Sequence, residues 1–155
     1  MQAPALADTG FGCLIGTWHV VNNRRTQDGA YETFEGTWKV TGHLDGGAIF
    51  EDYEGVLPDG RTWKVCGIWV LDREAAQWSH VYFTNLRAPD LAPLVGTISD
   101  GKGELFAVED TDTGTVHVRF SYDSGANTGR WSQALSVDGG RTWDVNWTQT
   151  YTRLS

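Results

Sequence analysis

The chain has 155 residues, a length that suits one domain, and its 20 acidic against 12 basic side chains give a formal charge of −8. This excess of negative charge disfavours nucleic acid and anionic membrane surfaces as partners. The sequence contains no apolar run near the roughly 20 residues of a membrane-spanning helix. Its first ten residues lack the basic start and apolar stretch of a signal peptide, so we expect a cytoplasmic protein with Cys13 and Cys66 as free thiols.

Composition favours β structure, because the chain contains 19 Gly, 8 Trp, 5 Tyr and 6 Phe and shows no long amphipathic helical pattern. After a lead-in segment, 1–14, strand-like segments are expected at 16–25, 31–43, 47–56, 61–72, 77–86, 95–99, 103–111, 115–122, 127–137 and 142–153. Asp-Gly and Gly-Gly turns between them are typical of hairpins. The sequence therefore predicts one all-β domain, 1–155, folded as an antiparallel up-and-down barrel of about 8–10 strands.

Two of these turns are nearly identical, since Asp59-Gly60-Arg61-Thr62-Trp63 is echoed by Asp138-Gly139-Gly140-Arg141-Thr142-Trp143. Each predicts a hairpin turn that leads into a strand with a buried Trp. The second turn also resembles the Asp-box of sialidase-type propellers, which is a structural turn, and 155 residues are too few for a six-bladed propeller. We therefore expect a structural role for both turns.

Alternate residues of a strand share a face, which predicts the barrel interior. In 142–153 the aromatic face should point inward, with Trp143, Val145, Trp147, Gln149 and Tyr151, and in 127–137 the inward face should include Trp131, Gln133 and Val137. The sequence does not decide which face points inward in 16–25, 47–56 and 77–86. In 47–56 the inward face carries either Glu51 or Asp52, and in 77–86 one of the two faces carries Trp78, His80 and Tyr82.

These faces predict a ligand site, because aromatic rings mixed with a few polar groups suit a pocket better than a dry core. The predicted ligand-binding residues are Trp63, Trp69, Trp78, Trp131, Gln133, Trp147, Gln149 and Tyr151. Arg24 and Arg119 are expected to be surface charges.

Gly16-Thr17-Trp18 at the first strand and Arg153 at the last resemble the calycin pattern of lipocalin-type barrels. The stretch Ser136–Arg153 is also similar to a group of bacterial calycin-like proteins of unassigned function. The resemblance implies a barrel with a small-molecule pocket, in which Arg153 covers the Trp18 ring within about 6 Å. It carries over no catalytic residue.

We expect no metal and no cofactor. Nitrobindin-type haem barrels share the Gly-Thr-Trp start and take an iron ligand from a His near the carboxyl end, but no His follows His117 here. The four His and two Cys show no zinc-ligand spacing. A nucleophile elbow and a glycine-rich phosphate loop are also missing from the sequence.

Two functions remain open. The first is binding of a small hydrophobic organic molecule inside the barrel. The second is a cofactor-free isomerase or cyclase that acts on an apolar, carbonyl-bearing substrate, with His80 as general acid or base, Glu51 orienting it, and Tyr82 holding the substrate oxygen. The sequence also leaves a homodimer open.

Overall fold

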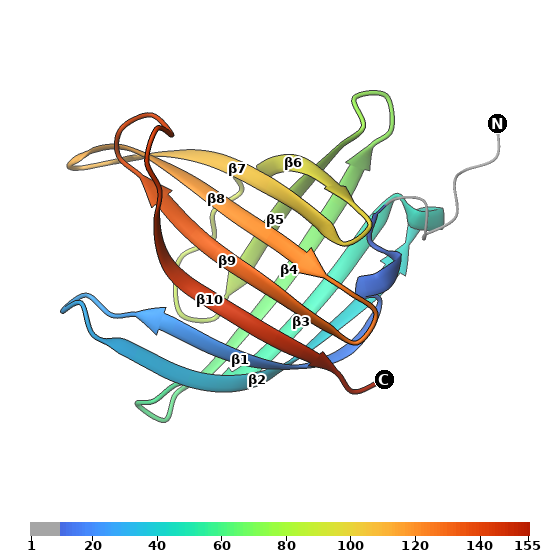
Figure 1. The fold of residues 1–155 in the computed structure, drawn as a ribbon, viewed down its shortest axis with the longest axis horizontal. Helices are drawn as coiled ribbons and strands as arrows, with labels where there is room; N and C mark the ends of the chain where they lie inside the picture. Colours follow the sequence, from blue (N-terminus) through green and yellow to red (C-terminus); the bar gives the residue numbers. More distant parts are fainter. Residues whose placement is uncertain (1–9) are drawn as a thin grey trace.

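Ten antiparallel strands close into one barrel in the computed structural model, which describes residues 10–155 (Figure 1). The strands are β1 (Gly16–Arg25), β2 (Tyr31–His43), β3 (Ala48–Val56), β4 (Thr62–Asp72), β5 (Gln77–Thr84), β6 (Leu94–Ser99), β7 (Lys102–Thr111), β8 (Gly114–Ser124), β9 (Thr128–Ser136) and β10 (Asp144–Arg153). Each strand pairs with its sequence neighbours, and β1 pairs with β10 to complete the ring. The predicted all-β up-and-down barrel is therefore confirmed.

The turn chemistry explains the meander, because Gly29 and Gly60 have φ of 86° and 87° in the β1–β2 and β3–β4 turns. Short 3-10 helices occur at Gly12–Leu14 (η2) and Leu44–Gly46 (η3). The predicted lead-in, 1–14, lies outside the described residues up to position 9, and η2 occupies its end.

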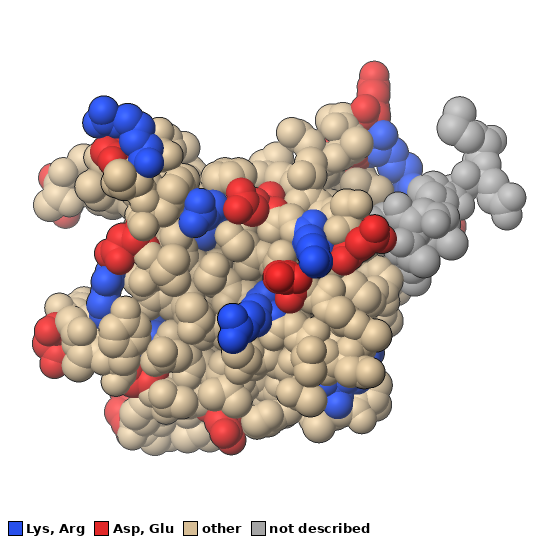
Figure 2. All heavy atoms as spheres, in the orientation of Figure 1, with Lys and Arg blue, Asp and Glu red and all other residues tan. Residues whose placement is uncertain are grey.

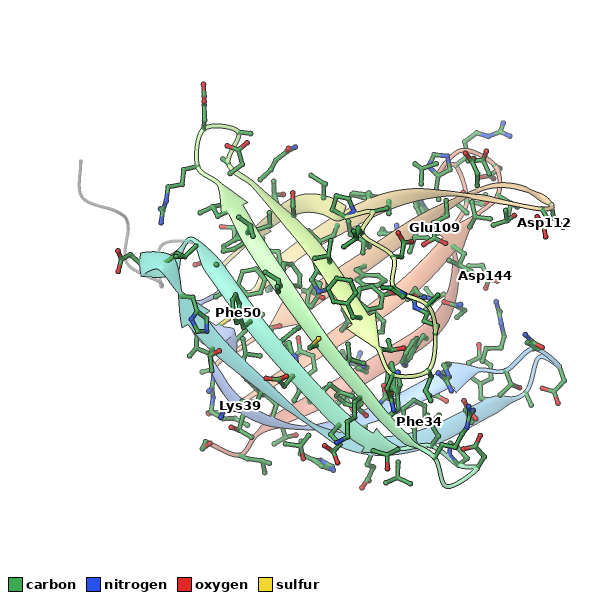
Figure 3. The ribbon with its side chains drawn as sticks, turned by 180° about the vertical axis from the view of Figure 1, so that it is seen from behind. Phe34, Lys39, Phe50, Glu109, Asp112 and Asp144 are labelled. Atoms are coloured by element: carbon green, nitrogen blue, oxygen red, sulfur yellow. The ribbon has the colours of Figure 1, made fainter. Side chains whose placement is uncertain are left out.

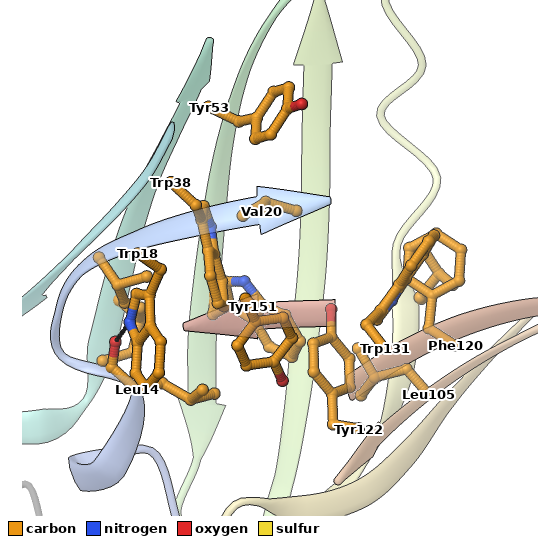
Figure 4. Packing of buried hydrophobic residues seen from close by; sticks show 14 of the residues in the cluster. Leu14, Trp18, Val20, Trp38, Tyr53, Leu105, Phe120, Tyr122, Trp131 and Tyr151 are labelled. Atoms are coloured by element: carbon orange, nitrogen blue, oxygen red, sulfur yellow. Dashed lines mark hydrogen bonds between the residues drawn. The ribbon is translucent and has the colours of Figure 1, made fainter. Parts of the chain in front are cut away.

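Trp18 lies near the start of β1, at one end of the barrel, and Figure 4 shows its ring beside Leu14. Its side chain is fully buried, its indole Nε1 donates to the Leu14 carbonyl oxygen at 2.9 Å, and the guanidinium carbon of Arg153 lies 4.2 Å from its ring centre. Arg153 also donates to the carbonyl oxygens of Cys13 and Ile15 at 2.5 and 2.7 Å. The expected stacking of Arg153 on Trp18 is confirmed, and the same guanidinium ties η2 to the last strand.

The structure determines which strand faces point inward where the sequence left the choice open. Trp18, Val20 and Asn22 of β1 are buried, whereas in β3 the inward face carries Glu51 and its neighbours two positions away. In β5 the inward face is that of His80. Figure 3 shows the same alternation in β2 and β3, where Phe34 lies inside the barrel and Phe50 on its outer surface.

The prediction that Trp143, Val145 and Val137 point inward is wrong. The β9–β10 pairing shifts by a bulge between Val145 and Trp147, which reverses the faces of the residues before it. Val145 is exposed, and Trp143 packs outside the barrel with its ring centre 4.6 Å from the guanidinium carbon of Arg119. Val137 is exposed for a different reason, because β9 ends at Ser136 and Val137 lies in the turn that follows.

The turn before Trp143 is held by Asp138, as its structural interpretation predicted. Asp138 accepts from the Arg141 and Thr142 amides at 3.0 and 2.9 Å and from the Thr142 hydroxyl at 2.6 Å. Hydrogen bonds from Thr142 and Ser136 lower the pKa of Asp138 to about 2. The turn is therefore a self-contained hydrogen-bonded unit outside the barrel.

On the face drawn in Figure 2, acidic and basic side chains are interspersed rather than gathered into a patch of one sign. Within residues 10–155, no helix is long and apolar enough to cross a membrane.

Candidate functional site

A cavity of about 350 Å³ occupies the barrel interior. Its mouth lies at the barrel end opposite Trp18 and is lined by Arg24 and Trp63, near the ends of β1 and β4, and by Leu86 and Arg87 of the loop after β5. The deeper wall is aromatic and is formed by Trp38, Tyr53, Tyr82, Phe120, Tyr122, Trp131, Trp147 and Tyr151. The remaining polar and small lining residues are Glu51, Val65, His80, Thr84, Gln133 and Gln149. The arrangement is an open, ring-lined pocket with a polar group at its floor.

Most of the predicted site residues lie together in this cavity. Its lining includes Glu51, Trp63, His80, Tyr82, Trp131, Gln133, Trp147, Gln149 and Tyr151. Trp69 and Trp78 point inward but do not reach the cavity, because Phe11 packs edge-on against them at ring-centre distances of 4.5 and 4.8 Å. They belong to the closed end of the barrel.

Glu51 and His80 form a buried pair at the floor of the cavity. The His80 Nε2 and Glu51 Oε1 atoms are 2.7 Å apart, and the side chains are only 3% and 11% exposed for His80 and Glu51. The Trp38 indole donates to the other carboxylate oxygen at 3.0 Å. The His80 ring stacks on Trp69 with a ring-centre distance of 4.1 Å. Both partners are therefore held in one orientation.

A glycine on the neighbouring strand makes room for the carboxylate. Gly67 of β4 pairs with Glu51, and a Cβ placed at Gly67 would come within 2.3 Å of Glu51 Oε1. Any larger residue at this position would therefore displace the carboxylate from His80.

The environment keeps Glu51 ionised. Burial opposes its charge, but attraction to His80 and hydrogen bonds from His80 and Trp38 outweigh burial and hold the pKa of Glu51 below its usual value. A carboxylate in this position can orient the imidazole and stabilise a positive charge on it. Because Glu51 occupies Nε2, the other ring nitrogen, Nδ1, is left buried and without a partner among the described residues.

Asn22 organises the opposite wall. It is fully buried, donates to the Tyr53 hydroxyl at 2.9 Å, and accepts from Trp147 Nε1 at 3.0 Å and Gln149 Nε2 at 2.8 Å. Burial raises the pKa of Tyr53 to about 12, although the hydrogen bond from Asn22 acts to lower it, so the hydroxyl stays protonated at neutral pH. The network fixes the Trp147 ring that faces the cavity.

Several lining residues were absent from the predicted site. Arg24, expected to be a surface charge, lines the mouth. The sequence held no signal that separates Arg24 from Arg25, because both faces of β1 carry an Asn followed two residues later by an Arg; the ion pair of Arg24 with Glu32 is seen only in the structure. Trp38 and Tyr53 follow the strand alternation and could have been found from it.

Within residues 10–155 there is no cluster of three or more His, Cys, Asp or Glu side chains that could hold a metal ion. Arg119 lies on the outer surface, as expected, and His117 lies on the same outward face of β8.

Solved structures confirm the fold. An S-type phycobiliprotein lyase, CPES from Guillardia theta, superposes with a TM-score of 0.64 at 13% identity over 94% of this chain and 90% of its own. Rv2717c from M. tuberculosis superposes with a TM-score of 0.68 at 14% identity over 100% of both chains. No protein-family model and no curated protein sequence matches the chain. The chain therefore has the fold of a calycin-type, lipocalin-like barrel.

Proposed function

We propose that this calycin-type barrel binds a small, mainly apolar organic molecule in its interior. The observation that carries the proposal is the cavity of about 350 Å³, which opens at one barrel end and is walled by indole and phenol rings. Its volume falls within the range of about 300–1,000 Å³ typical of small-molecule pockets. Flat, conjugated molecules fit such walls well, because aromatic rings gain from offset or edge-to-face contacts.

The polar groups of the wall are arranged to hold a ligand without rearrangement. Asn22 fixes Trp147 and Gln149, and Glu51 fixes His80, so the side chains that meet a ligand are already oriented. Preorganisation of this kind supports affinity, because less conformational freedom is lost on binding.

Binding is tested with the neutral dye N-phenyl-1-naphthylamine, whose fluorescence rises in apolar surroundings. Thr84→Trp places a large ring in the cavity and should abolish the rise, whereas Thr150→Trp, on the exposed face of β10, should bind as the wild type does. Circular dichroism checks that both variants fold. A wild-type barrel that does not bind the dye, or a folded Thr84→Trp variant that binds it equally well, would refute interior binding. As a separate measurement, native mass spectrometry of the protein as purified would identify a ligand that co-purifies with it.

The buried Glu51–His80 pair favours a second candidate, a cofactor-free isomerase or cyclase that acts on an apolar carbonyl compound. In this proposal His80 removes a proton from the carbon beside the carbonyl group and returns it elsewhere, Glu51 stabilises the imidazolium, and Tyr82 donates to the enolate oxygen. All three residues line the cavity.

Proton abstraction can be measured without knowing the natural substrate. The methyl protons of 2-acetylnaphthalene should exchange with heavy water faster in the presence of the protein, and His80→Ala should remove the acceleration. His117→Ala, a histidine on the outward face of β8, is the matched control. Exchange at equal rates with wild type and His80→Ala would exclude His80 as the base and leave simple binding.

A further inference from the structure

Two arginines stand at the mouth of the cavity. Arg24 lies near the end of β1, and Arg87 lies in the loop after β5. In the closed ring, β1 and β5 are separated by β2, β3 and β4, so the two side chains approach the mouth from different sides of the wall. They are the lining residues with a permanent positive charge, in a chain whose net charge is −8.

Arg24 is held rigidly by its neighbours. Its guanidinium carbon lies 5.0 Å from the ring centre of Phe34 and 5.1 Å from that of Trp147. Its Nε and Nη2 atoms both donate to one oxygen of Glu32, at 2.8 and 2.5 Å. A guanidinium has five N–H groups, and the other N–H groups of Arg24 have no partner among the described residues. The side chain is 29% exposed, so these donors are oriented and partly shielded from water.

Arg87 lies over the Tyr82 ring, with its guanidinium carbon 4.9 Å from the ring centre. Within residues 10–155 it makes no ion pair, so its charge is free to meet a ligand. Tyr82 in turn lines the cavity, which places this charge above the aromatic wall.

The floor of the cavity has the opposite character. Glu51 is the one carboxylate among the lining residues, and its oxygens already accept from His80 and Trp38. An anionic group at the floor would meet this carboxylate. At the mouth it would meet the guanidinium of Arg87, which has no ion-pair partner among the described residues, and the remaining N–H groups of Arg24, whose charge is shared with Glu32. Between these ends the wall is aromatic.

We propose that the ligand is an amphipathic anion, a flat apolar body that enters first and carries an acidic oxygen group held by Arg24 and Arg87 at the mouth. This inference rests on the proposed binding function and specifies the ligand class. Carboxylates and sulfonates share the required chemistry, since guanidinium groups bind both through charge-assisted hydrogen bonds.

The test compares two dyes that differ in one group. The anion 8-anilinonaphthalene-1-sulfonate and the neutral N-phenyl-1-naphthylamine share the same ring system, so the ratio of their dissociation constants reports the sulfonate alone. Wild type should prefer the anion, and Arg87→Gln should weaken anion binding about tenfold while changing neutral-dye binding less than twofold. Arg24→Gln should act in the same direction, but it also loses ring contacts, so Arg87→Gln is the decisive variant.

Arg130→Gln removes a charge from an exposed side chain outside the cavity and is the matched control, expected to leave both constants unchanged. If wild type binds both dyes equally, or if Arg87→Gln and Arg130→Gln have the same effect, the anion proposal is wrong while interior binding stands. If neither dye binds, the proposed function fails, and the anion proposal fails with it. Displacement of the dye 8-anilinonaphthalene-1-sulfonate by 2-naphthoate, but not by the methyl ester of 2-naphthoate, would extend the result to carboxylates.

Discussion

Replacing Glu51 by Gln tests whether the buried pair at the cavity floor stabilises the barrel. Gln has the same shape and can still accept from Trp38, but it loses the charge that attracts His80. Hydrogen bonds to charged groups contribute about 1.5–3 kcal/mol, so Glu51→Gln should lower the free energy of unfolding by about 1–3 kcal/mol. Glu51→Ala leaves His80 and Trp38 unpaired and should lower it by about 3–5 kcal/mol.

The stabilisation by Glu51 should depend on pH in a definite direction. The pKa of Glu51 is lower in the folded protein than the value of 4.5 of the free side chain, so its stabilisation is complete above about pH 4.5 and is lost as the pH falls below that value. The difference in stability between wild type and Glu51→Gln should therefore be largest near about pH 7 and should shrink in acid.

Urea denaturation followed by Trp fluorescence, at neutral and acidic pH, measures both effects. Glu54→Gln is the matched control, because Glu54 lies on the same strand, points outward and pairs with Lys64 in solvent. That substitution should change stability by no more than about 0.5 kcal/mol. A Glu51→Gln variant as stable as Glu54→Gln at neutral pH, or a difference from wild type that grows in acid, would refute the account of the pair.

Three further substitutions or titrations test other regions of the fold. Trp18→Ala should lower the free energy of unfolding by about 3–5 kcal/mol in urea denaturation, since the ring is fully buried; a loss below about 1 kcal/mol would contradict its role in closing the barrel. Gly67→Ala should destabilise by about 1–3 kcal/mol, because the new Cβ would meet Glu51 Oε1 at 2.3 Å, whereas Gly125→Ala, with its nearest atom at 3.5 Å, should have little effect. In an ultraviolet titration Tyr53 should ionise near pH 12 in the folded protein. Its usual pKa is 10.0, so the stability that the protonated hydroxyl adds should be lost as the pH rises from 10 toward 12. Ionisation of every tyrosine near pH 10 would show that Tyr53 is not buried as described.

The sequence was most informative where one local rule determined the outcome. Asp-Gly turns marked the connections β1–β2, β2–β3, β3–β4, β6–β7 and β9–β10, and strand alternation placed Trp131, Gln133 and Tyr151 around one cavity. The Gly-Thr-Trp start and the Arg near the end of the last strand predicted the contact between Trp18 and Arg153.

Predictions failed where alternation alone could not decide. Trp143 points outward because the bulge before Trp147 changes the parity of the strand, and a bulge leaves no mark in an alternating pattern. Trp69 points inward, as predicted for the site, but alternation does not say how deep along the barrel a residue lies, and Phe11 covers it. Arg24 was missed because both faces of β1 carry an Arg and an Asn at corresponding positions.

The pairing of β1 with β10 has a consequence for biosynthesis. The first strand, Gly16–Arg25, finds its second partner only in Asp144–Arg153, so the ring stays open while the eight strands between them are synthesised. Until then β1 presents an unpaired edge, and such edges promote pairing between chains. Closure also joins segments far apart in sequence, and contacts of this kind slow folding. The risk of aggregation is therefore greatest before β10 emerges, and Arg153, which ties the last strand to η2 and Trp18, ends that period.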